Sequence, residues 1–235
     1  MPAKGVQTTP PSRTDTEAFL FMASPGIHHA LIVGDGDVPA CAALDAAWPG
    51  WADGADLVIA ADGGFRKAAG AGLRGDLLVG DGDSLGPDGG AEARAAGVPV
   101  EFAEVAKDET DVELALLAAV ARGAARITIL GALGGPRFDH ALANVWLLAH
   151  PGIAGGAAVL LDATTRIRLL SAGAGEGSAA ATLAGTPGDL VSLLPFGGDA
   201  EGVTTSGLAA MGRRRRARDR GRRRLSQGGD RGTAR

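Results

Sequence analysis

Short runs of Leu, Val and Ile that are apolar throughout recur along the first 150 residues. They predict strands at residues 30–33, 57–61, 77–79, 98–102 and 126–130. Each run is followed by an Ala-rich stretch with helical character. A strand without polar alternation is covered on both faces, as in a parallel sheet. The pattern therefore predicts an α/β class domain with a doubly wound, mainly parallel sheet.

Beyond residue 151 the pattern changes to short segments in which apolar and polar residues alternate. The segments are residues 157–161, 166–170, 179–183 and 190–194, with Gly- or Pro-bearing turns between them. They predict a small all-β second domain. The expected organisation is a disordered segment at 1–26, an α/β domain at 27–151, a β domain at 152–211 and a disordered Arg-rich tail at 212–235.

Charge separates the body of the chain from its end. The net charge of -4 arises from 23 basic and 27 acidic residues. Residues 212–235 hold 11 Arg and 2 Asp, which leaves 12 basic and 25 acidic residues in 1–211. An acidic body suits metal binding better than nucleic-acid binding. We therefore expect no nucleic-acid partner despite the Arg-rich tail.

Composition also limits which metal ion the protein can bind and indicates the cell compartment. One cysteine, Cys41, excludes an internal disulfide, and four histidines without a Cys-x-x-Cys pair leave little material for a zinc site. A hard ion with oxygen ligands, such as Mg²⁺, fits better. No apolar stretch approaches the roughly 20 residues that span a bilayer, and the N-terminus has no signal-peptide core. The sequence predicts a cytoplasmic protein without a membrane partner.

Acidic residues stand where several of the apolar runs stop. Asp62 follows the second run, Asp81 and Asp83 follow the third, residues 108–111 precede a helical stretch, and Asp139 follows the fifth run. Ligands gather outside the carboxyl ends of parallel strands. We therefore expect these carboxylates to converge on one edge of the sheet.

The segment GDGDS at residues 80–84 gives the sharpest metal signal. Asp81 and Asp83 stand two residues apart on a turn and can reach one cation, while the glycines let a phosphate approach closely. A calcium-binding EF-hand loop starting at Asp81 is the alternative, because positions 1, 3, 6 and 12 fit its pattern. Leu85 at position 5 and an entering segment predicted as a strand argue against it.

Two Gly-containing segments have a structural explanation beside a functional one. The segment ADGG at residues 61–64 is either a nucleotide contact or only a tight β-to-α turn. The segment GGPRFDHALAN carries Arg137 and Asp139, followed by His140 and Asn144 one helical turn apart. Arg137 can clamp a phosphate, but each of these residues alone could simply belong to a helix start.

The segment KDETDVE combines a helix cap with extra charge. Thr110 and Glu113 form a capping box, and an apolar stripe follows them, so a helix is predicted to begin here. The cap needs only these two residues. Lys107, Asp108 and Asp111 are surplus charges at the helix start and are candidates for function.

In this order, the motifs resemble those of the thiamine pyrophosphokinase family. That family has a strand then D-G-G, a strand then G-D-x-D-S, T-D at a helix start, and G-G-R-x-D-H with a nearby A-N. The matching segments here are Asp62-Gly63-Gly64, Gly80-Asp81-Gly82-Asp83-Ser84, Thr110-Asp111, Arg137-Phe138-Asp139-His140 and Ala143-Asn144. The resemblance covers roughly residues 30–207 and extends into the β part.

The resemblance implies an α/β nucleotide-binding domain followed by a β-sandwich, in a homodimer that binds thiamine between its subunits. The implied activity is that of a thiamine diphosphokinase, which transfers the diphosphate of ATP to the hydroxyl of thiamine and releases AMP. Mg²⁺ is the implied cofactor and ATP the co-substrate. No P-loop motif is present, so positioning and electrostatics would carry the catalysis.

The resemblance also implies roles for individual residues. The implied metal ligands are Asp81, Asp83 and Asp111. The implied catalytic residues are Asp62, Asp111, Arg137 and Asp139. The implied nucleotide contacts are Asp62, Gly63, Gly64, Ser84, Thr110, Arg137, His140 and Asn144.

The chain departs from the family pattern in two places. Pro136 separates the glycines from Arg137. This insertion can shift the guanidinium from its place in the family pattern or make the loop bulge. After Leu208 an Arg-rich segment replaces the expected β-structure, so the implied sandwich-like domain is incomplete at its C-terminus. A shifted reading frame would produce such a segment. The replacement of these strands can impair activity. Two other functions therefore stay open. One is a Mg²⁺-dependent nucleotide pyrophosphohydrolase in which water replaces the thiamine hydroxyl, and the other is an inactive nucleotide-binding module.

Overall fold

The chain divides into two compact units, Met1–Ala180 and Ala181–Arg235. A computed structural model describes residues 27–86, 88–102, 108–153, 157–171 and 179–208, together with a strand at 215–217. The predictions of disorder for residues 1–26 and for most of 212–235 lie outside the described residues, and so does Lys107.

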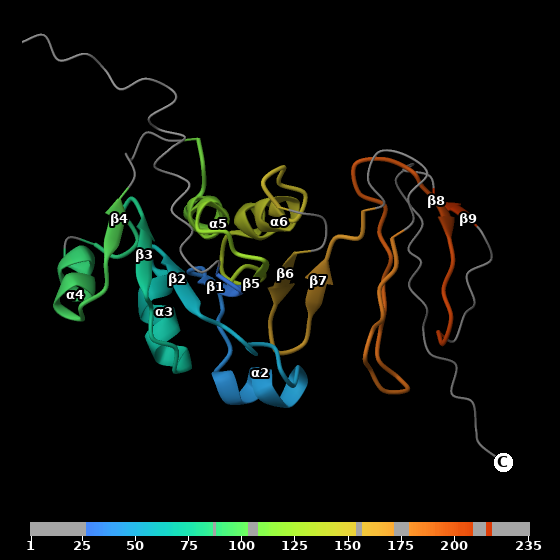
Figure 1. Cartoon of the computed structure of the whole chain (residues 1–235), viewed down its shortest axis with the longest axis horizontal. Helices are drawn as coiled ribbons and strands as arrows, with labels where there is room; N and C mark the ends of the chain where they lie inside the picture. The colour runs from blue at the N-terminus through green and yellow to red at the C-terminus, as the bar shows by residue number, and fades with distance from the viewer. Residues whose placement is uncertain are drawn as a thin grey trace, which may run out of the picture. The chain divides into compact units, whose positions relative to one another are not determined.

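The first unit is built on a seven-stranded sheet with the strand order β4-β3-β2-β1-β5-β6-β7 (Figure 1). The strands are β1 (His29–Val33), β2 (Leu57–Ala61), β3 (Leu77–Gly80), β4 (Val100–Phe102), β5 (Arg126–Leu130), β6 (Ala158–Leu161) and β7 (Arg166–Arg168). Neighbouring strands pair in parallel except β6 and β7, which are antiparallel. The mainly parallel α/β sheet predicted from the sequence is confirmed.

Helices cover both faces of this sheet. They are α2 (Cys41–Ala47), α3 (Gly64–Ala71), α4 (Gly89–Ala95), α5 (Asp111–Ala121) and α6 (Phe138–Leu147). Helices α5 and α6 lie over one face, and α2 and α3 lie over the other (Figure 1). Successive residues of β1 serve the two faces in turn, since Ile32 packs in the core with Leu116 of α5, whereas Val33 packs with Leu44 of α2. No described helix is long and apolar enough to cross a membrane.

Strands β6 and β7 correct the predicted domain boundary. The alternating pattern predicts both segments to lie in a β domain at 152–211, but β6 pairs in parallel with β5 and β7 pairs with β6. The physical reason lies in the β6 sequence, AVLL, which is apolar throughout, and Leu160 is fully buried. This is the pattern of a covered strand in a parallel sheet. The first unit therefore extends to Ala180.

The described residues of the second unit, 181–208 and 215–217, contain one two-stranded sheet. It consists of β8 (Ala200–Val203) and β9 (Arg215–Ala217) in antiparallel pairing. Residues 179–183 form no strand, and 190–194 hold a single bridge, so a small all-β domain is not confirmed. Strand β9 lies in the segment predicted to be disordered. Strand pairing uses main-chain hydrogen bonds, so an Arg-rich strand carries no apolar signal that sequence patterns could detect.

The first turn of α3 packs directly against the end of β1. A Cβ atom on Gly64 would lie 1.9 Å from the carbonyl oxygen of Val33. A Cβ atom on Gly70, in the same helix, would have no atom within 4 Å. The first glycine is thus required by close packing, whereas the second is not.

We predict opposite effects for the two Gly→Ala substitutions in α3. Gly64→Ala should lower the free energy of unfolding by about 2 kcal/mol or more, because the backbone has to move apart. Gly70→Ala should raise it by about 0.5 kcal/mol, because Ala loses less backbone entropy in a helix. Urea denaturation of both variants measures the difference. Equal changes in the two variants would contradict the packing described here.

Candidate functional site

Four carboxylates lie together at the carboxyl edge of the sheet. Asp62 follows β2, Asp81 and Asp83 follow β3, and Asp111 is the first residue of α5. One oxygen of each lies within 4.8 Å of one oxygen of every other. The expected convergence of these four residues is confirmed. Asp139, which was expected with them, is not a member of this carboxylate cluster.

Asp62 is the buried member of the carboxylate cluster. Its side chain is 1% exposed, and its backbone φ of 42° is in the left-handed region that few residues other than Gly adopt. Its Oδ2 atom accepts a hydrogen bond of 2.8 Å from the Ser84 N–H. Its Oδ1 atom has no hydrogen-bond partner among the described residues. A buried oxygen without a partner is costly, and a cation would satisfy it.

The site fits a hard cation for two reasons. The donors are all carboxylate oxygens, and Mg²⁺ prefers oxygen ligands to softer ones. The unpaired Oδ1 of Asp62 supplies the second reason. The metal-binding role of Asp81, Asp83 and Asp111 stays a prediction, and the structure adds Asp62 to the candidate ligands.

The pKa of Asp62 is set first by burial and then by its neighbours. Burial raises the pKa of Asp62 to about 6, and the Asp83 side chain also raises it, while the hydrogen bond from Ser84 lowers it. The interactions with Asp62 and with the Ser84 hydroxyl hold the pKa of Asp83 below its usual value. Without a cation, a proton that the pair takes up as the pH falls is therefore held on the buried carboxyl of Asp62.

The loop after β3 is shaped by its own carboxylates and glycines. The Asp83 N–H donates to Oδ1 of Asp81 at 3.1 Å, and the Ser84 hydroxyl donates to Oδ1 of Asp83 at 3.0 Å. A Cβ atom on Gly80 would lie 2.9 Å from the Cβ of Asp62, so glycine lets the two strand ends meet. A strand enters this loop, whereas an EF-hand loop follows a helix. The EF-hand alternative is therefore wrong.

At the start of α5 the helix cap and the carboxylate cluster use different residues. The Glu113 N–H donates to the Thr110 hydroxyl at 3.2 Å, which confirms Thr110 as the N-cap. Asp111 takes no part in this bond and belongs to the carboxylate cluster. Asp108 is exposed and lies outside the cluster.

The loop that leads into α6 holds an exposed ion pair. Arg137 Nε donates to Oδ1 of Asp139 at 2.9 Å, and both side chains are 63% exposed. The guanidinium holds the pKa of Asp139 well below its usual range. His140 is exposed as well. Asn144 is buried and donates to the carbonyl of Ala132 at 3.1 Å, so it ties α6 to the segment after β5.

Two carboxylates after β1, Asp35 and Asp37, were not predicted from the sequence. The Gly135 N–H donates to Oδ2 of Asp37 at 3.2 Å, so Asp37 holds the loop that carries Arg137. A Cβ atom on Gly63 would lie within 2.4–2.7 Å of the Asp35 carboxylate, which places Asp35 against the turn beside Asp62. The signal was present, since an apolar run followed by GDGD occurs after β1 as it does after β3.

Comparisons with known proteins bear on this site. The family model "Thiamin pyrophosphokinase, catalytic domain" matches residues 50–159, which include the whole carboxylate cluster and the Arg137 loop. The resemblance to the thiamine pyrophosphokinase family is confirmed over these residues. A thiamin pyrophosphokinase family protein from Enterococcus faecalis is similar, with 25% identity, 80% of this chain and 84% of that chain covered, and a TM-score of 0.57.

Two further solved structures and one negative result complete the comparison. The thiamine pyrophosphokinase of Bacillus subtilis is 24% identical, with 80% of this chain and 83% of that chain covered and a TM-score of 0.57. The thiamin pyrophosphokinase of Geobacillus thermodenitrificans is 32% identical over 57% of this chain and 59% of that chain, with a TM-score of 0.45. No curated protein matches the chain. The Bacillus structure supports the fold of the family over most of the chain.

We predict that stability and function separate at the start of α5. Thr110→Ala should lower the free energy of unfolding by about 1 kcal/mol, because the N-cap bond is lost. Asp111→Asn should leave stability nearly unchanged and weaken Mg²⁺ binding, because a carboxylate of the cluster is lost. Thermal melts and calorimetric Mg²⁺ titration of both variants measure this. Parallel behaviour of the two variants would assign Asp111 to the cap alone.

Mg²⁺ binding should weaken as the pH falls through the pKa of Asp62. Because that pKa is raised to about 6, the carboxyl is largely charged at pH 7 and largely protonated at pH 5. The cation must then displace a proton, and its affinity should fall about tenfold over this interval. Calorimetric titration at several pH values tests this. Asp62→Asn should remove that part of the pH dependence, and a flat profile in the unmodified chain would exclude Asp62 as a ligand.

Proposed function

We propose that this chain is a Mg²⁺-dependent thiamine diphosphokinase. The proposal is supported above all by the carboxylate cluster, in which the buried Oδ1 of Asp62 lacks a partner. In the proposed reaction the thiamine hydroxyl oxygen bonds to the β-phosphorus of ATP. The bond between that phosphorus and the oxygen leading to the α-phosphorus breaks, so AMP leaves and the hydroxyl proton is released.

The carboxylate cluster makes a cation necessary for this substrate. ATP carries about four negative charges, which the cluster would repel. Asp62, Asp81, Asp83 and Asp111 would hold Mg²⁺, which supplies the positive charge that bridges carboxylates and phosphates. The glycine-rich backbone of the β3–α4 loop leaves room for the phosphates to reach these ligands.

Arg137 would offset the phosphate charge that remains. Its two hydrogen bonds to Asp139 orient the planar guanidinium, and its exposure leaves the other N–H groups accessible. Asp139 thus acts as a positioning residue for Arg137 in this proposal. The further proposed nucleotide contacts are Gly63, Gly64, Ser84, Thr110, His140 and Asn144. The homodimer and the cytoplasmic location stay predictions.

A nucleotide pyrophosphohydrolase is the second candidate. The observation that favours it is the second unit, whose described residues form one two-stranded sheet instead of the β-sandwich expected to help bind thiamine. An assay of AMP release from Mg-ATP with and without thiamine separates the candidates. AMP formed only with thiamine supports the diphosphokinase. AMP and pyrophosphate formed without thiamine indicate the hydrolase, and nucleotide binding without AMP indicates an inactive module.

We predict that the two carboxylates after β3 are essential for turnover. Asp81→Asn or Asp83→Asn should lower the rate at least about a hundredfold, or about 2.7 kcal/mol of transition-state stabilisation. Asp88→Asn is the matched control, because Asp88 is exposed, close in sequence and outside the carboxylate cluster. Steady-state kinetics over a range of Mg²⁺ concentrations give the result. Near-normal turnover in either cluster variant would exclude the metal assignment.

A further inference from the structure

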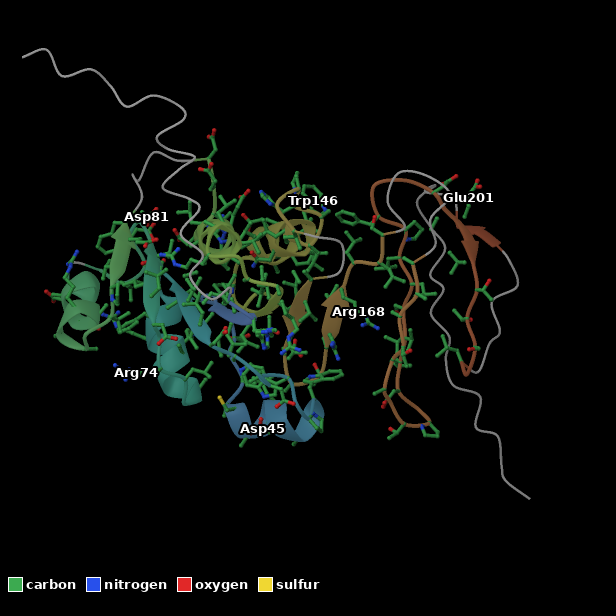
Figure 2. The ribbon with its side chains drawn as sticks, in the orientation of Figure 1. Asp45, Arg74, Asp81, Trp146, Arg168 and Glu201 are labelled. Atoms are coloured by element: carbon green, nitrogen blue, oxygen red, sulfur yellow. The ribbon has the colours of Figure 1, made fainter. Side chains whose placement is uncertain are left out.

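Helix α6 has an apolar face that the described residues leave largely exposed. Phe138, Leu142 and Trp146 are spaced four residues apart, so they lie on one side of the helix. Their side chains are 78%, 44% and 61% exposed, and Trp146 is labelled at α6 in Figure 2. The opposite side of the helix is buried through Asn144 and Leu147. Single exposed apolar residues are ordinary, but three on one helix face indicate an interaction surface.

A pocket of about 340 Å³ adjoins this face. Its wall includes Trp146 and Leu147 from α6, Glu113 from α5 and Pro151, and most of the wall is apolar. A partner that fits both the exposed face and the pocket needs several large apolar side chains within a short stretch of chain.

The chain itself contains such a stretch at residues 19–22, Phe-Leu-Phe-Met, which lies outside the described residues. It holds two of the six phenylalanines of the chain. Val6 is the only other Val, Ile, Leu, Phe or Trp in residues 1–26. The dipeptide Pro25-Gly26 follows shortly after it, and such a dipeptide favours a turn. The sequence therefore lets the apolar stretch turn back toward the described part of the chain.

The described chain begins on the face of the sheet that α6 covers. Ile27 packs against the core cluster that includes Leu147 and Leu148 at the end of α6. Its carbonyl accepts a hydrogen bond of 3.0 Å from the Ala125 N–H, just before β5. Met22 precedes Ile27 by five residues, and five extended residues span about 17 Å. Since the ten residues of α6 extend over about 15 Å, residues 19–22 can reach any part of that helix.

We propose that residues 19–22 pack on the apolar face of α6 in the same chain, with a phenylalanine side chain in the pocket beside Trp146. Two considerations favour this segment over a second copy of the chain. A stable interface between two proteins takes about 800 Å² from each partner, which is more than one side of a ten-residue helix offers. A short linker also keeps the segment at a high effective concentration near α6. The prediction of disorder for the rest of residues 1–26 is unaffected.

The first part of the test measures protection of α6. Hydrogen exchange of residues 138–147 is followed by mass spectrometry in the full chain. The double variant Phe19→Ser/Phe21→Ser should exchange about tenfold faster there, because apolar contacts that oppose local opening are lost. Val6→Ser is the matched control, because it removes an apolar residue outside residues 19–22, and it should leave the exchange unchanged.

The second part changes the helix and measures the segment. Chymotrypsin cleaves after Phe and Leu, so the digestion rate reports whether residues 19–22 are held against the protein. The double variant Leu142→Gln/Trp146→Gln should raise the cleavage rate there about tenfold, because cleavage requires the segment to leave α6. Leu190→Gln is the control, because Leu190 is 79% exposed in the second unit, and it should leave the cleavage rate unchanged.

Three results would overturn the proposal. Equal exchange of α6 in the unmodified chain and in Phe19→Ser/Phe21→Ser would show that residues 19–22 do not cover the helix. Protection of α6 that disappears on dilution of the unmodified chain would assign the face to a second copy. Equally fast cleavage in the unmodified chain and in Leu142→Gln/Trp146→Gln would show that the segment is not held by this face. Neither part of the test depends on whether the chain produces AMP.

Discussion

Repulsion between like charges is the constraint on which the site depends. Four carboxylates with oxygens within 4.8 Å of one another would separate if they were free to move. The sheet prevents this, because β2 and β3 are neighbours and their ends are fixed by parallel pairing. The start of α5 brings the fourth carboxylate, and the Thr110 cap fixes where that helix begins. The packed core of the first unit therefore opposes the repulsion between the four carboxylates.

Close approach of the backbone is the second condition for the site. Gly80 lets the β3 end meet Asp62, and Gly64 lets α3 meet the end of β1. The amino edge of the same sheet is organised differently. There His29 is buried, with Nε2 2.9 Å from the Thr128 hydroxyl, which joins β1 to β5. Polar groups at that edge are paired with each other, whereas at the carboxyl edge one buried oxygen of Asp62 stays without a partner among the described residues.

The sequence was most informative where local pattern and tertiary structure agree. The strands of the α/β unit were predictable because each is an apolar run followed by a helical stretch, and the convergence of Asp62, Asp81 and Asp83 follows from parallel topology. The position of β6 was not deduced, since its apolar run was interpreted as part of an alternating segment. The pairing of Arg137 with Asp139 and the inward hydrogen bond of Asn144 could not be deduced, because both depend on side-chain directions that spacing does not determine. Asp35 and Asp37 could have been found from the repeated GDGD pattern.

The backbone of Asp62 has a consequence for the evolution of this chain. A non-glycine residue at φ 42° and a buried, partly protonated carboxyl both disfavour the folded state. Selection for heat resistance alone would therefore replace Asp62 by Gly, which adopts this conformation freely and buries no charge. Such a variant would gain robustness by discarding a candidate metal ligand. Retention of Asp62 against that pressure would be a sign that the chain is still under selection for the chemistry of its site.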